Sequence, residues 1–133
     1  MVRTFMGIVA GLIAWTVIGA CGLFVLRLSW PAYALAETQM TFTLAMQISR
    51  LAVSVASSVG GGWLAATIAG QGRAAWWLGV LLVIIFIPIH YSLWNKFPAW
   101  YHLTFLLTLA PIVGVSGRLA GEAGGQHTIG VAR

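Results

Sequence analysis

The sequence predicts an all-α membrane domain, a bundle of four transmembrane helices that run up, down, up and down. Two observations lead to this prediction. Of the 133 residues, 60% are hydrophobic and only 7% are charged, and the apolar residues fall into four long runs separated by short polar breaks. A water-exposed surface needs roughly 25–35% charged residues, so this composition suits lipid instead.

Each apolar run has the length of a membrane span, since a hydrocarbon core about 30 Å thick requires roughly 20 apolar residues in a helix. The runs cover residues 5–26, 41–69, 75–94 and 100–119. Glycine or proline stands with polar residues in every break, and such combinations end helices. We expect one domain over residues 1–120, followed by a glycine-rich, flexible polar tail over residues 121–133.

The distribution of Lys and Arg predicts the orientation. With four spans, one side carries Arg3, Arg73, Arg118 and Arg133, whereas the other carries Arg27 and Lys96, with Arg50 near its boundary. We therefore expect a protein of the bacterial inner membrane, in contact with lipid, with both termini in the cytoplasm. The basic residues stand singly, so there is no basic patch that would bind nucleic acid.

Aromatic residues gather at the expected span ends, where Trp and Tyr favour the interface between lipid and water. Trp76 and Trp77 mark the inner side, and a larger set marks the outer side: Trp30, Tyr33, Tyr91, Trp94, Trp100 and Tyr101. Both outer breaks contain aromatic-Pro-Ala-aromatic, at residues 30–33 and 97–100. Either the two hairpins form a parallel repeat, or two loops reached the same solution independently.

The most functional-looking feature is a polar face on the second span. Gln47, Arg50, Ser54 and Ser57 recur at intervals of three and four, which places them on one side of a helix. Lipid penalises polar groups, so this side is expected to face protein or water. Glu37 is the only acid nearby and the candidate partner of Arg50. The face predicts a polar path or binding site, and ordinary helix packing is the alternative.

Small residues at four-residue spacing predict close helix packing, because they let backbones approach. The second span offers Ser58, Gly61 and Gly62, and the first offers Gly7 and Gly11 as a complementary flat face. We expect the glycines of the second span to pack against a bulky neighbour such as Trp15. The glycines at 7, 11, 117 and 121 also invite helices of partner chains.

Two histidines, His90 and His102, end the third span and open the fourth. Antiparallel neighbours would bring both imidazoles to a similar depth, where a pair can ligate haem iron or a metal ion. No further Cys or Asp ligand stands nearby in the sequence, so hydrogen bonding is the favoured interpretation and no cofactor is expected.

Enzymatic signatures are missing. The chain contains no aspartate, no paired carboxylates and no Gly-x-Ser-x-Gly or phosphate-loop motif. The expected function is therefore non-enzymatic: helix-helix assembly, as a homo-oligomer or as an accessory subunit of a membrane complex. The alternative is a small channel or transporter with its path along the second span, and the third hypothesis is a haem or metal module.

The segment from Asn95 to Phe105 resembles a Pro-x-Trp-Tyr-His-Leu segment of uncharacterised small four-helix bacterial membrane proteins. The resemblance implies a membrane fold and carries no function. The chain also differs from small multidrug exporters, because none of its expected spans contains an acid.

Overall fold

The computed structural model describes the backbone of residues 1–130 and the side chains of residues 1–123. The described part is all-helical, and four of its helices are long and apolar enough to cross a membrane, with residues 99–123 forming the apolar part of the last. The helices are α1 (Val2–Ser29), α2 (Pro31–Gln39), α3 (Leu44–Ala69), α4 (Arg73–Ser92) and α5 (Ala99–Gly130).

The helix ends differ from the expected spans at several points. Helix α3 begins at Leu44 rather than at residue 41, because Thr43 caps it by accepting a hydrogen bond from the Met46 N–H at 3.4 Å. Helix α5 continues beyond residue 119 to Gly130, so the first ten residues of the expected tail have a helical backbone. Arg133, which entered the charge count, lies outside the described residues.

The short helix α2 was not expected from the sequence. Proline favours the first helical position, where its missing N–H is not needed, and Pro31 starts α2 in this way. Met40 ends the helix in the left-handed conformation, with φ of 55°, and the Thr41 N–H donates to the Ala36 carbonyl at 3.0 Å. The second aromatic-Pro-Ala sequence leads directly into α5 instead, so only the first hairpin carries an extra helix.

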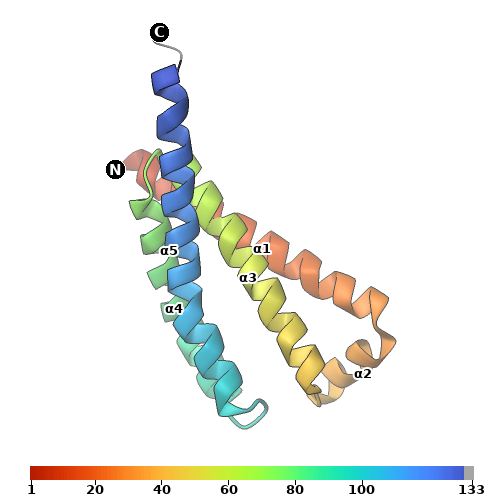
Figure 1. The fold of residues 1–133 in the computed structure, drawn as a ribbon. Helices are drawn as coiled ribbons and strands as arrows, with labels where there is room; N and C mark the ends of the chain where they lie inside the picture. Colours follow the sequence, from red (N-terminus) through yellow and green to blue (C-terminus); the bar gives the residue numbers. More distant parts are fainter. Residues whose placement is uncertain (131–133) are drawn as a thin grey trace.

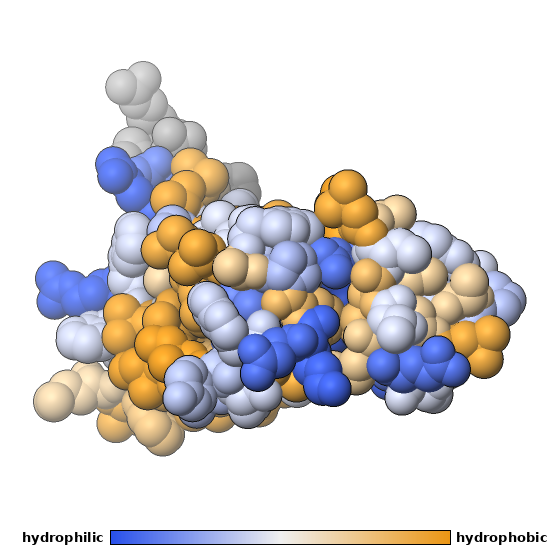
Figure 2. All heavy atoms as spheres, turned by 90° about the horizontal axis from the view of Figure 1, so that it is seen from below, coloured by the Kyte–Doolittle hydropathy of each residue, from blue (hydrophilic) through white to orange (hydrophobic). Residues whose placement is uncertain are grey.

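The four long helices form a wedge (Figure 1). Helix α3 packs against α1, α4 and α5, and α4 packs against α5. Toward the end that carries α2, the α1 and α3 pair diverges from the α4 and α5 pair, whereas the helices converge at the other end. We call these the α2 end and the closed end. Seen from the α2 end, hydrophilic residues form separate patches among hydrophobic ones (Figure 2).

Glycines hold the helices together toward the closed end. A Cβ atom on Gly11 would lie 2.6 Å from the Gly61 carbonyl oxygen, and one on Gly62 would lie 2.2 Å from the Val113 carbonyl oxygen. Gly61 also lies against Trp15, as its spacing suggested. These distances are too short for any side chain, so α1, α3 and α5 meet backbone to backbone.

The glycines that seemed to invite partner helices are therefore largely occupied within the chain. Gly7 faces Ala65 and Ala69 of α3, and a Cβ on Gly117 would lie 2.1 Å from the Ala75 Cβ atom of α4. The small-residue faces explain the fold of one chain and do not by themselves point to a second one.

Candidate binding cavity at the α2 end

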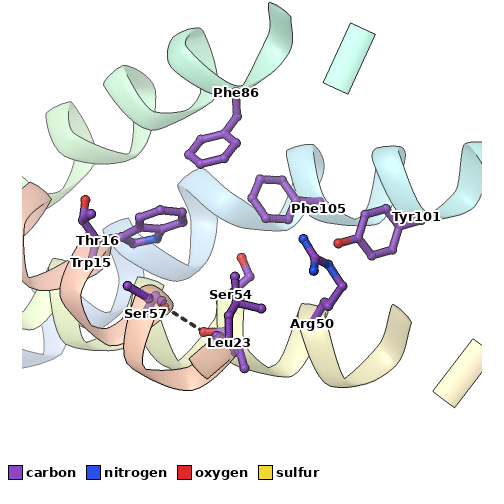
Figure 3. A pocket seen from close by; sticks show the side chains of 12 residues that line it. Trp15, Thr16, Leu23, Arg50, Ser54, Ser57, Phe86, Tyr101 and Phe105 are labelled. Atoms are coloured by element: carbon purple, nitrogen blue, oxygen red, sulfur yellow. Dashed lines mark hydrogen bonds between the residues drawn. The ribbon is translucent and has the colours of Figure 1, made fainter. Parts of the chain in front are cut away.

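The divergence of the helices leaves a cavity of about 320 Å³ between α1, α3, α4 and α5 (Figure 3). Most of its wall is apolar, and α3 supplies the main polar groups. The lining residues are Trp15, Thr16, Gly19, Ala20, Leu23, Arg50, Val53, Ser54, Ser57, Phe86, Tyr101 and Phe105.

Arg50 provides the charge in this wall. Its Nη1 atom donates a hydrogen bond to the Tyr33 hydroxyl at 2.6 Å and lies 3.6 Å from the Glu37 Oε1 atom. The guanidinium carbon lies 4.9 Å from the centre of the Phe42 ring, within cation–π range. In Figure 3 the Tyr101 hydroxyl faces the guanidinium from α5. The Nε atom of Arg50 is buried and has no hydrogen-bond partner among the described residues.

Helix α2 holds this charged group in place. Tyr33 is fully buried and packs with Ala36 and Met46, so α2 lies over the start of α3. Burial raises the pKa of the Tyr33 hydroxyl above its usual value, although the charge of Arg50 acts in the opposite direction. The hydroxyl is therefore neutral at physiological pH. Glu37 forms ion pairs with both Arg27 and Arg50.

The charges at this end do not balance. One carboxylate, that of Glu37, serves two guanidinium groups, those of Arg27 and Arg50. Arg27 is 53% exposed, whereas Arg50 is 22% exposed and lies in the cavity wall. The cavity therefore contains a partly buried cation that shares its only ion-pair partner among the described residues.

The predicted polar face only partly coincides with the cavity. Arg50, Ser54 and Ser57 line it, and Glu37 reaches it through Arg50. Gln47 does not line the cavity. Its side-chain amide instead donates a hydrogen bond to the Phe42 carbonyl at 3.2 Å, next to the start of α3. Ser57 donates to the Val53 carbonyl of its own helix at 2.8 Å, whereas the Ser54 hydroxyl has no hydrogen bond to any described residue.

The cavity ends at a packed floor. Trp15 stands over Gly61, its indole N–H donates to the Ser58 hydroxyl at 3.2 Å, and its ring centre lies 5.1 Å from that of Phe86. Beyond this floor, Leu78 and Val113 are fully buried. The polar face of α3 therefore does not continue as an open path toward the closed end.

The histidine pair lies beside the cavity, where α4 ends and α5 begins. The Nδ1 atoms of His90 and His102 are 2.8 Å apart, so the two rings hydrogen-bond directly and one must be the donor. Both rings are buried, and Phe105 and Trp94 stack on them. The contact is too short for an ion between these atoms, given metal–nitrogen bonds of about 2.0–2.1 Å. Within the described residues, no three His, Cys, Asp or Glu side chains gather as a metal site.

Sequence reasoning missed the aromatic part of the cavity. Tyr33 and Tyr101 were expected in an interfacial belt, but Tyr33 is 0% and Tyr101 is 6% exposed. The expectation was wrong because α2 carries Tyr33 inward and the start of α5 turns Tyr101 toward Arg50. Phe86, Phe105 and Leu23 lie in apolar runs, where nothing distinguishes a cavity side from a lipid side. Only Thr16, a polar residue within the first span, was a usable signal.

Comparisons with known proteins give no match: no family model, no curated protein sequence and no solved structure matches this chain.

Proposed function

We propose that this chain is a multi-pass protein of the bacterial inner membrane that binds a small, largely apolar ligand in the cavity at the α2 end and catalyses no reaction. The cavity carries the proposal. Its volume of about 320 Å³ falls within the roughly 300–1,000 Å³ of typical ligand sites. Such sites combine an apolar lining with a few placed polar groups, as Arg50 and Ser54 are placed here.

The proposed topology is up-down-up-down, with both termini in the cytoplasm. Residues 70–72 join α3 to α4 and residues 93–98 join α4 to α5, and such short connections favour antiparallel neighbours. The longer connection from α1 to α3 contains α2. Counted from the sequence, the cytoplasmic side then has four basic residues, those at 3, 73, 118 and 133, and the other side has those at 27, 96 and, near its boundary, 50. This small excess is in the direction of the positive-inside rule. In this orientation the cavity opens in the outer half of the membrane.

Binding from one end fits the geometry better than conduction through the bundle. A channel needs a continuous polar path, whereas the polar face of α3 stops at Ser57 and the packed floor under Trp15 follows. Catalysis lacks support, because the cavity wall contains no acid, histidine or thiol that could act as a general base or nucleophile.

Assembly with a second chain is a second candidate, and one observation favours it. Among the residues of α1 only Gly7 and Gly11 are buried, and the side of this helix that carries Ile13, Val17 and Phe24 is exposed. Chemical cross-linking in native membranes tests this candidate. A cross-linked dimer at low expression would support it, and a purely monomeric pattern would contradict it.

The binding proposal is tested by filling the cavity with a larger side chain and measuring the mass of any bound ligand. Native mass spectrometry of protein released from its own membranes should show a bound small molecule on the wild type. Ser54→Trp, which fills the cavity, should lose it. Val55→Trp is the matched control, since Val55 is the next residue and is 42% exposed on another face of α3. Equal occupancy in all three proteins would refute the proposal.

A further inference from the structure

We propose that the ligand of the cavity is a single-chain amphipathic carboxylate, whose carboxylate contacts Arg50 and whose alkyl chain lies among the aromatic residues. This inference rests on the proposed function and specifies its ligand class. It follows from the charge, the free polar groups, the shape and the opening of the cavity.

The charge of the wall favours an anion. Taking a cation out of water is costly unless a partner compensates it, and Arg50 shares Glu37 with Arg27. Arg50 lines the cavity, so its guanidinium group can be approached from there. A carboxylate is the natural complement, because guanidinium groups bind it through two parallel N–H donors. A cationic head group would be repelled by Arg50, and a neutral one could accept a hydrogen bond but would not compensate the charge.

A second donor stands one helical turn away. Ser54 follows Arg50 by four residues, so both side chains lie on the same face of α3, and both line the cavity. Because the Ser54 hydroxyl has no partner within the described part of the chain, it can donate to one carboxylate oxygen while Arg50 donates to the other. Ser57, one turn further, already uses its hydroxyl within α3.

The remaining wall suits an alkyl chain of limited length. Trp15, Leu23, Phe86 and Phe105 surround the space beyond the polar pair. At about 30 Å³ per small heavy group, the volume of about 320 Å³ holds about ten heavy atoms, the size of a medium-chain carboxylate. The lining residues Thr16 and Ala20 of α1 are themselves exposed, so a longer tail can leave past α1 toward lipid. The space itself holds only one chain, which is why the ligand proposed is single-chained and not an intact phospholipid.

The experiment compares two photoreactive probes with the same tail in protein reconstituted in nanodiscs at pH 8. One probe is a diazirine-bearing decanoic acid, and the other is the corresponding decanol. Labelled positions are mapped by peptide mass spectrometry, and labelling is competed with unlabelled decanoate, decanol or decyltrimethylammonium. We expect the acid probe to label the cavity residues of α1 and α3, and decanoate to compete at least tenfold better than the other two compounds.

Three variants test whether the positive charge of Arg50 increases labelling by the acid probe. Arg50→Gln should reduce labelling by the acid probe at least tenfold and leave labelling by decanol unchanged. Glu37→Gln should increase labelling by the acid probe at subsaturating concentration, because both arginines then lack their carboxylate. Arg73→Gln is the matched control, since Arg73 begins α4 at the closed end, and it should change nothing. If Arg50→Gln does not fold, Glu37→Gln and the competition series decide.

The outcomes distinguish a failure of the inferred ligand class from a failure of the proposed binding function. If both probes label the cavity equally and the variants change nothing, Arg50 only joins α2 to α3, and the inference of an anionic ligand is overturned while cavity binding stands. If both probes label only lipid-exposed positions such as Ile13 and Val17, the proposed function is overturned as well.

Discussion

Substituting Gly62 by alanine tests whether α3 and α5 meet backbone to backbone in the way the structure shows. The added Cβ atom would lie 2.2 Å from the Val113 carbonyl oxygen and 2.3 Å from the Ser116 Oγ atom. Ser116 could rotate, but a carbonyl within a helix cannot. Heavy atoms pack at about 3.5 Å, so α5 would have to move by about 1 Å. Gly121→Ala is the matched control, because the nearest atom to its Cβ, the Gly72 nitrogen, is 3.5 Å away.

The two substitutions should have opposite effects on the free energy of unfolding. Replacing glycine by alanine inside a helix gains about 1 kcal/mol in the absence of a clash, which is the upper limit expected for Gly121→Ala. Overpacking costs about 1–3 kcal/mol, and the backbone contact at Gly62 places it near the upper end of that range. After the gain in helix propensity, Gly62→Ala should lose about 2 kcal/mol.

The assay is reversible unfolding by sodium dodecyl sulfate in mild detergent micelles, followed by circular dichroism. The chemical change is the same at both positions, so only the surroundings can produce a difference. If Gly62→Ala proves as stable as Gly121→Ala, the close approach of α3 and α5 is refuted, and with it the packed base on which the cavity rests.

Three further predictions follow from the same structure. Trp15→Phe and Ser58→Ala each remove the hydrogen bond at the cavity floor and should each cost about 1 kcal/mol of unfolding free energy. The double variant should cost less than the sum, and strict additivity would argue against the bond. In a Cys21→Ala background, Ser54→Cys should react with a water-soluble methanethiosulfonate reagent much faster than Val55→Cys, because thiolates form in water; equal rates would contradict an accessible cavity. A fluorescent protein fused to the C-terminus should fluoresce, whereas alkaline phosphatase at the same position should be inactive, and active phosphatase would reverse the proposed orientation.

Hydrophobic run length was enough to predict the number of long apolar helices and the breaks between them. It could not predict α2, whose nine residues are only moderately apolar and resemble a connection. The helix depends on Pro31 at its start and on Tyr33 packing against Met46, and the second contact joins residues from separate elements. Local patterns carry no information about such contacts.

The candidate cavity could also be predicted from the sequence only in part. The spacing of Arg50, Ser54 and Ser57 indicated one helix face, since helical periodicity is local. The sequence could not show that Gln47, on the same face, hydrogen-bonds to the Phe42 carbonyl at the start of α3. Nor could it show that Tyr101 of α5 lines the cavity. His90 and His102 were expected at similar depth, but their direct contact depends on how α4 and α5 pack.

By itself, the sequence determined that this chain is made of apolar helices long enough to cross a membrane, because hydropathy and the scarcity of charge act residue by residue. It also determined which few polar groups were available for recognition. Only the tertiary structure decided which of them share a space. Close glycine contacts bring α3 against α1 and α5, and the helices diverge toward α2. The divergence leaves Arg50 in a cavity wall, where it shares the carboxylate of Glu37 with Arg27. The glycine spacing indicated that helices approach closely, whereas their divergence and the cavity depend on long-range packing that no local pattern encodes.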